Sequence, residues 1–383
     1  MGFAGEESSA LPEDSGIAKI VTLEKNRRYG LWKVLRGLAG PVPVTVLNCW
    51  SPRMVGELLH GCRLQKFETV QIEGVHLMEY LPAIRSSLGS PRVVVDWHNI
   101  ESELMWRYAG NGVNFLKKAA AARTAKLIER AEDRLLDTAD VHTVTSERER
   151  KKLWARRPNA NIRVVPNGVD AAHFSAREIL EASLRARPNS HAEDSKPSIL
   201  FVGSMDYHAN IDAVLWFSRT VWPEIARNYP QIRFTIVGRD PAPEIRRLAS
   251  ERIHVTGKVD DVRPYYASAI ATVVPLRAGS GTRLKILESM AAEVPIVSTR
   301  LGAEGIDAED NVHLLLADDG AEIAAAIGQI ISSAETRNRL TIAARKLVTS
   351  RYDWSAIGEQ LYRIHCELLR ERGRHSVPQE SEA

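Results

Sequence analysis

A glycine loop, two cations and one carboxylate follow one another between residues 270 and 299. Glycines adopt backbone angles that turn successive N–H groups toward a ligand, and a helix start adds unpaired N–H groups and a positive dipole end. We expect Thr282 to open that helix. The residues that would surround a diphosphate group are Gly279, Ser280, Gly281, Thr282, Arg283 and Lys285.

Glu288 lies one to two helical turns beyond the loop, where its carboxylate could accept hydrogen bonds from ribose hydroxyls. The same pattern also fits an ordinary strand-to-helix connection with surface cations and a helix-surface acid. Taken alone, the motif is only moderately specific, so its context decides.

The whole chain has 383 residues, which favours two domains over one. Its 44% hydrophobic and 26% charged residues are typical of globular proteins. A net charge of +3 gives no support to a nucleic-acid binder. Three widely spaced cysteines indicate neither a disulfide framework nor a metal site, and favour a reducing cytoplasm. The polar, acidic first residues do not resemble a signal peptide.

Short apolar segments alternate with helical patterns along the chain, which predicts an α/β fold with largely parallel sheets. In the first half these segments are residues 18–23, 42–48, 68–74, 92–99, 141–146 and 162–170. In the second half they are residues 199–205, 233–240, 253–259, 270–276 and 295–300. Segment 42–48 is the weakest strand, because Pro41 and Pro43 limit pairing, and an extended linker is the alternative.

These patterns predict five parts of the chain. They are a first domain over residues 1–174, a partly helical linker over 175–197, a second domain over 198–351, a helix over 352–373 that returns to the first domain, and a polar tail over 374–383.

Two basic stretches are candidates for contact with an anionic membrane surface. The first spans residues 27–36, where cations alternate with Trp32 and Leu35, and the second spans residues 117–157 around Trp154. A solvated helix face with ion pairs is the alternative, since acids dilute the second stretch.

Five motifs in order resemble the GT-B glycosyltransferases of the retaining family 4, especially bacterial sugar transferases of exopolysaccharide and cell-surface pathways. They are DWHNIESEL (96–104), VVPNGVD (164–170), FVGSMDYHAN (201–210), VTGKVDDV (255–262) and GSGTRLKILESMA (279–291). The resemblance spans about residues 17–365. It implies two Rossmann-like doubly wound domains facing a cleft, with the nucleotide-sugar held mainly by the second and the acceptor by the first.

The resemblance also implies roles for single residues. Gly203 and Ser204 would approach the diphosphate, Gly238 would end a neighbouring strand, Lys258 and Val259 would lie near the base, and Glu288 would be the ribose-binding glutamate. His98 matches an active-site histidine facing the donor sugar, whereas a structural histidine beside Asp96 or Asn99 is the alternative. Glu73 ends a strand and either points to the cleft or caps the following helix.

Three departures from the family pattern stand out. Ser280 occupies the position of a common donor-binding glutamate, and Ser204 and His208 occupy those of a common arginine and lysine, for which Arg283 and Lys285 are expected to substitute. We also expect residues 18–23 to form the first strand, so that the family's N-terminal strand and glycine-rich loop are missing and the first domain is truncated.

The function implied is transfer of a hexose, with retention, from a UDP- or GDP-linked donor to a cell-surface glycan or lipid-linked acceptor. Catalysis would use His98, Arg283 and Lys285 on one face of the sugar, without a carboxylate pair, a metal or a cofactor, because Asp206 and Asp240 alone are poor ligands. The protein would be cytoplasmic, or peripheral on the inner face of the plasma membrane. A non-catalytic nucleotide-sugar-binding or partner protein is the alternative, and a nucleotide-sugar epimerase is less favoured.

Overall fold

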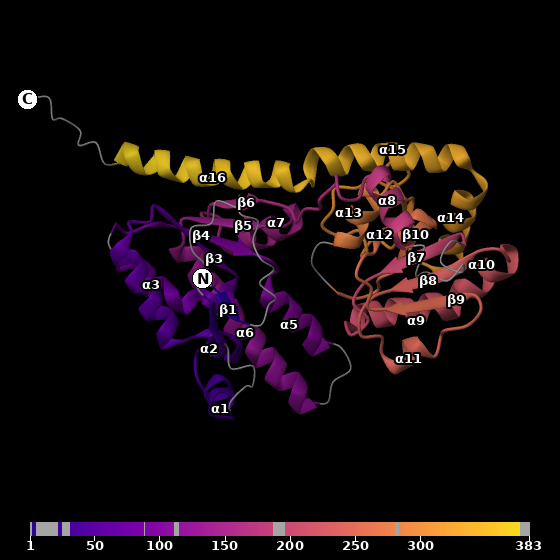
Figure 1. Ribbon diagram of the computed structural model, residues 1–383. Coiled ribbons are helices and arrows are strands. Elements are labelled where there is room, and N and C mark those ends of the chain that lie inside the picture. The colour runs from indigo at the N-terminus through magenta and orange to yellow at the C-terminus, as the bar shows by residue number, and fades with distance from the viewer. Residues whose placement is uncertain are drawn as a thin grey trace, which may run out of the picture. The chain divides into compact units, whose positions relative to one another are not determined.

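The computed structural model describes residues 2–4, 22–24, 31–87, 89–110, 115–186, 196–279 and 283–375. The chain divides into two compact units (Figure 1). The first comprises Met1–Val164 with Arg363–Ala383, and the second comprises Val165–Tyr362.

The first unit contains a four-stranded parallel sheet in the order β3-β4-β5-β6. Its strands are β3 (Thr69–Glu73), β4 (Arg92–Trp97), β5 (Val141–Val144) and β6 (Ile162–Val164). Val93, Val94 and Val95 of β4 have no exposed surface, as expected for a central parallel strand covered on both faces. These four predicted strands are confirmed.

Helices surround this sheet. They are α1 (Leu31–Ala39), α2 (Val44–Cys49), α3 (Pro52–Leu64), the 3-10 helix η1 (Val75–Tyr80), α4 (Leu81–Arg85), α5 (Glu101–Gly110), α6 (Phe115–Thr138) and α7 (Glu147–Arg156). The last helix, α16 (Trp354–His375), belongs to this unit from Arg363 onward. There His365 forms hydrogen bonds to the side chains of Thr69 and Gln71 on β3.

The strand predicted over residues 42–48 is wrong, because this segment contains helix α2 instead. Pro43 precedes the helix with φ −59°, a conformation in which its missing N–H costs no helical hydrogen bond. Val46 is fully buried, and the Tyr80 hydroxyl donates to the Cys49 carbonyl at the helix end. Packing of one apolar face therefore outweighs the β-branched composition of the segment.

A strand precedes residues 18–23, contrary to the prediction. Strand β1 (Gly2–Ala4) pairs in parallel with β2 (Thr22–Glu24). Three residues are too few to produce a periodic signal, so the sequence pattern did not reveal β1.

The second unit contains a six-stranded parallel sheet in the order β12-β11-β10-β7-β8-β9. Its strands are β7 (Ser198–Val202), β8 (Arg233–Val237), β9 (Ile253–Gly257), β10 (Ala269–Val274), β11 (Ile296–Ser298) and β12 (Leu315–Leu316). The five predicted strands are confirmed, and β12 was not predicted. The strand order reverses between β7 and β10, and ligands of doubly wound sheets bind at the carboxyl ends of the strands beside such a reversal.

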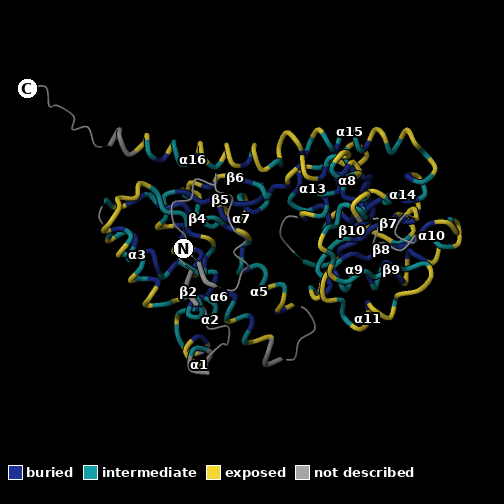
Figure 2. Tube along the Cα trace, viewed as in Figure 1, coloured by how far each residue is buried: buried dark blue, intermediate teal, exposed yellow. Residues whose placement is uncertain are grey.

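The helices of this unit are α8 (Ala176–Ala186), α9 (His208–Thr220), α10 (Trp222–Asn228), α11 (Pro243–Arg246), α12 (Arg263–Ala267), α13 (Leu284–Ala291), α14 (Gly320–Ser332), α15 (Ala334–Arg351) and the start of α16. Figure 2 shows the buried residues gathered on the strands, with exposed residues along α15. Helix α8 lies inside the predicted linker and packs on α12, where Arg263 and Glu178 form a 3.1 Å ion pair.

Within the described parts of the chain, no helix is both long enough and apolar enough to cross a lipid bilayer.

Candidate functional site

Lys285 lies at the centre of the candidate site in the second unit. It is on the first turn of α13, which begins at Leu284 and directly follows Arg283. The Lys285 Nζ donates to Asn210 Oδ1 on α9 at 2.9 Å and lies 4.3 Å from the ring centroid of Phe201, which has no exposed surface. The residue as a whole is only half-buried, so its charged end is the part that lies inward.

Two predicted glycines allow the backbone to pass close to this lysine. A Cβ atom on Gly203 would lie 2.8 Å from both Lys285 Nζ and Asn210 Nδ2. A Cβ atom on Gly238 would lie 1.8 Å from the Gly203 carbonyl oxygen, so no other residue fits there. Gly203 follows β7 and therefore lies at the carboxyl end of a strand beside the reversal.

The described part of the glycine loop brings Arg283 to the same end of the sheet. Gly279 has φ +107°, which strongly favours glycine, and a Cβ there would lie 3.2 Å from both Arg283 Nη2 and the Tyr207 hydroxyl. Arg283 is only 7% exposed. Ser280, Gly281 and Thr282 lie outside the described residues, so their predicted binding roles stay predictions. The helix does not begin at Thr282 as expected but at Leu284, because Arg283 has a non-helical backbone conformation and serves as the N-cap.

The electrostatic environment of Lys285 disfavours its charge. Burial, together with the nearby Arg283 guanidinium, lowers the pKa of Lys285 to about 7, and the Glu288 carboxylate offsets this only in part. Two neighbouring basic side chains in a buried position would favour the binding of an anion.

Glu288 is already engaged by a buried tyrosine. The Tyr266 hydroxyl donates to Glu288 Oε2 at 3.0 Å. Burial raises the pKa of Glu288, although the bond from Tyr266 and the charge of Lys285 act in the opposite direction. The second carboxylate oxygen is the one that would accept a ribose hydroxyl.

Ser204 is half-buried and is part of a series of polar contacts that the sequence did not reveal. Its hydroxyl donates to Asp206 Oδ1 at 2.6 Å and accepts from Arg239 Nε at 3.0 Å. Arg239 directly follows Gly238, so a cation from the next strand lies beside the position where many family members carry an arginine. In the sequence, the position of Arg239 directly after Gly238 at the end of a strand could have indicated this contact.

Lys258 and Val259 lie at the end of β9, away from Lys285. Lys258 is exposed on a hollow of about 420 Å³ that is also lined by Asp240, Arg246 and Gly257, and whose lining includes neither Gly203 nor Lys285. The base-binding role expected for this segment stays a prediction.

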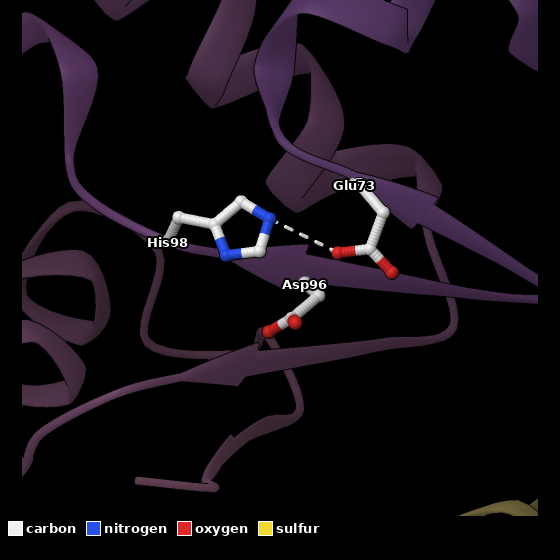
Figure 3. Close-up of side chains that lie close together, drawn as sticks. All are labelled: Glu73, Asp96 and His98. Atoms are coloured by element: carbon white, nitrogen blue, oxygen red, sulfur yellow. Dashed lines mark ion pairs between the residues drawn. The ribbon is translucent and has the colours of Figure 1, made fainter. Parts of the chain in front are cut away.

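A second polar group lies in the first unit, at the carboxyl ends of β3 and β4 (Figure 3). Glu73 and Asp96 are direct neighbours in the parallel pairing, and His98 follows β4. His98 Nε2 lies 3.1 Å from Glu73 Oε2. Gln71 donates to the other oxygen of Glu73, and Thr143 donates to Asp96 Oδ1 at 2.7 Å.

These contacts shift the three pKa values in different directions. The bond to Glu73 raises the pKa of His98, and the same bond lowers the pKa of Glu73. Burial raises the pKa of Asp96, and the neighbouring Glu73 charge adds to the effect. Separated pKa values of neighbouring groups are characteristic of sites that move protons or orient hydroxyls.

The sequence did not reveal this carboxylate pair. One ligand atom from each of Glu73, Asp96 and His98 lies within 4.8 Å of the others, so the group could also hold a divalent cation. The ion pair with Glu73 favours a protonated imidazole, so a cation would have to displace that proton in order to bind His98.

Comparison with known proteins identifies the family of the chain. A family model described as Glycosyltransferase Family 4 matches residues 19–173, and one described as Glycosyl transferases group 1 matches residues 196–333. Together they account for more than half of the chain.

The phosphatidyl-myo-inositol mannosyltransferase of Mycolicibacterium smegmatis is 28% identical over 208 residues, covering 52% of this chain and 50% of that protein. A glycogen synthase of Mycobacterium tuberculosis is 27% identical over 227 residues, covering 55% and 50%. The matched part thus spans about half the length of these curated relatives.

Solved structures extend the similarity over nearly the whole chain. Sucrose-phosphate synthase from Thermosynechococcus elongatus has a TM-score of 0.66 at 19% identity, covering 94% of this chain and 87% of that one. Anabaena HepE in complex with UDP and glucose has a TM-score of 0.60 at 15% identity, covering 90% and 85%. The fold class is therefore GT-B, with two Rossmann-like domains. Within that class, the two family models show that the chain belongs to the glycosyltransferases of the family 4 type.

Proposed function

We propose that this protein transfers a hexose, with retention of configuration, from a nucleotide-diphosphate sugar to a glycan or lipid-linked acceptor of the cell surface. The observation that carries the proposal is the pair of Arg283 and Lys285 beside the glycines that follow β7 and β10. A diphosphate leaving group gains negative charge as the bond to the sugar breaks, and fixed cations at that point stabilise the transition state.

In this proposal the second unit binds the donor. Lys285 and Arg283 neutralise the diphosphate, and the glycine positions 203 and 279 let it approach the backbone. Glu288 accepts from the ribose through the oxygen that Tyr266 does not use. HepE was solved with UDP and glucose, which supports a uridine nucleotide as the first donor to test.

The first unit supplies the hydroxyl-orienting group. His98, held by Glu73, donates a hydrogen bond to a sugar hydroxyl. The bond to Glu73, aided by the nearby Asp96 charge, raises the pKa of its imidazole. Retention would follow if the incoming hydroxyl is deprotonated by the leaving phosphate oxygen on the same face of the sugar. This route needs no metal and no enzymatic nucleophile.

Calorimetric titration with UDP, GDP and their common sugar conjugates tests the proposal, followed by an assay of donor hydrolysis and of anomeric configuration in the product. Binding with turnover and a retained anomer is the expected result. Binding without turnover would favour the non-catalytic alternative, and absence of binding would remove the donor assignment altogether.

We propose further that the protein lies in the cytoplasm and contacts the anionic inner face of the plasma membrane through α1. Leu35 is 51% exposed and Arg36 is exposed beside it, which suits an interfacial helix. The second basic stretch supports this less, because several of its cations are paired: Arg148 and Lys152 with Glu103, and Arg156 with Glu132. Flotation with vesicles containing phosphatidylserine should recover the protein, and Leu35→Glu with Arg36→Glu should abolish recovery, whereas equal recovery would contradict the proposal.

A further inference from the structure

Every contact of the Lys285 ammonium described above is with a neutral group. Asn210 Oδ1 accepts one hydrogen bond at 2.9 Å, and the face of Phe201 lies 4.3 Å away. Among the described residues, no carboxylate lies within ion-pair distance of Lys285 Nζ. A buried ammonium without an anionic partner is unstable relative to its neutral amine.

Among the described residues, the charged groups that act on Lys285 come from α13 and the residue before it. Arg283, which directly precedes the helix, opposes protonation of Lys285, whereas Glu288 on the helix favours it but is bonded to Tyr266. Helix α9 contributes the uncharged Asn210, and β7 contributes Phe201 with the Gly203 turn. A bound anionic ligand would supply the negative charge that the described residues do not place beside Lys285 Nζ.

Asn210 determines where the ammonium points. Its Oδ1 accepts from Lys285, while its Nδ2 donates to the Ser204 carbonyl at 2.9 Å, so one side chain ties the lysine to the turn after β7. A carboxamide does this without adding charge, whereas an aspartate of the same shape would pair with the lysine permanently.

We propose that binding of a nucleoside diphosphate at this site is coupled to the uptake of one proton by Lys285, and that Asn210 is the positioning residue that keeps this lysine uncompensated until the ligand arrives. The inference rests on the proposed function, because the anion is taken to be the donor diphosphate. The proton comes from solvent and converts the amine to an ammonium, and no covalent bond to the ligand forms.

The coupling has a measurable size. Since the pKa of Lys285 in the free protein is about 7, roughly 0.9 of the lysine is uncharged at pH 8 and about 0.1 at pH 6. Titration with UDP at pH 8, in buffers of different ionisation enthalpy, should therefore show uptake approaching one proton per site. Uptake at pH 6 should be near zero or negative, because the lysine is already charged and the ligand phosphate itself can release a proton.

Two variants separate this effect from other proton exchanges. Asn210→Asp introduces a carboxylate beside Nζ, so Lys285 should be charged before binding and the uptake at pH 8 should be lost. Lys285→Arg keeps a cation that cannot be deprotonated, and should lose the uptake equally. Unchanged uptake in both variants, or no uptake in the parent protein at pH 8, would overturn the proposal.

The free protein provides an independent readout that does not require any ligand. Reductive ¹³C-methylation followed by NMR titration should show a lysine signal, absent in Lys285→Arg, that titrates far below the ordinary lysine range and moves upward in Asn210→Asp. If that signal titrates near pH 10, the proposal is wrong even if UDP binds tightly. If the titration is as expected but no nucleotide binds, the donor assignment and the coupled proton uptake are wrong. The result would then support only the statement that Lys285 is buried without an anionic partner.

Discussion

His98 Nε2 lies 3.1 Å from Glu73 Oε2, so the carboxyl end of β3 holds the histidine that follows β4. The two residues belong to separate motifs of the sequence, and the parallel pairing of Glu73 with Asp96 brings them together. In the proposed mechanism Glu73 would act through His98, as a positioning residue rather than a catalytic one. Its two carboxylate oxygens contact Gln71 and His98, and the following helix η1 has no side-chain cap at its N-cap residue Gly74.

Glu73→Gln should lower the pKa of His98, because the bond from Glu73 is the largest cause of its elevation. If the protonated imidazole is the active form, activity is present below this pKa and is lost as the pH rises through it. The falling limb of kcat/KM against pH should move to lower pH in the variant, with a loss of at least about tenfold at neutral pH. Glu68→Gln, an exposed acid just before the same strand, is the matched control. An unchanged limb in Glu73→Gln would exclude the positioning role.

Arg283→Gln should weaken nucleoside diphosphate binding by roughly 10- to 100-fold, the usual cost of losing a charged hydrogen bond. Binding of the corresponding nucleoside, which lacks phosphates, should change little. Calorimetry with UDP and uridine measures both, and Arg219→Gln on the exposed end of α9 serves as the control for a general charge effect. Equal UDP affinity in Arg283→Gln and the parent protein would remove the phosphate assignment.

Glu288→Gln should weaken uridine and UDP by a similar factor, about fivefold, because a carboxamide accepts more weakly than a carboxylate. Tyr266→Phe removes the hydroxyl that bonds to Oε2 and to Ser289, leaves the Glu288 carboxylate in place, and should leave nucleoside affinity nearly unchanged. Comparing the two variants by calorimetry distinguishes a ribose contact from a packing effect. A loss confined to UDP in Glu288→Gln would show that the ribose role is wrong.

Removal of divalent cations should affect neither donor binding nor turnover. Glu73 and Asp96 lie close enough to His98 to hold a cation, but the ion pair already satisfies the histidine. Activity measured after dialysis against EDTA, with and without added Mn²⁺ or Mg²⁺, tests this. Loss on chelation and recovery with one metal, both abolished in Glu73→Gln, would instead assign a metal site to the end of β3 and β4.

The amino-acid sequence by itself determined the fold class and most of the strands. Central parallel strands are covered on both faces, so runs such as Val93–Val95 are apolar throughout and stand out without any knowledge of packing. The glycines at positions 203, 238 and 279 were likewise visible, since their lack of a side chain is itself the requirement of the site. Short or conflicting local signals failed: β1 is three residues long, and the valines of residues 42–48 read as a strand although α2 forms there.

Only the tertiary structure decided how the site residues meet. Lys285 reaches Asn210 across 75 residues of sequence, and Glu288 reaches Tyr266 across 22. Glu73, Asp96 and His98 come together through the register of two parallel strands. Such contacts depend on the order and register of the strands, and neither property is encoded in the spacing of the residues themselves. For the same reason the low pKa of Lys285 follows from its neutral surroundings, which only the packed structure specifies.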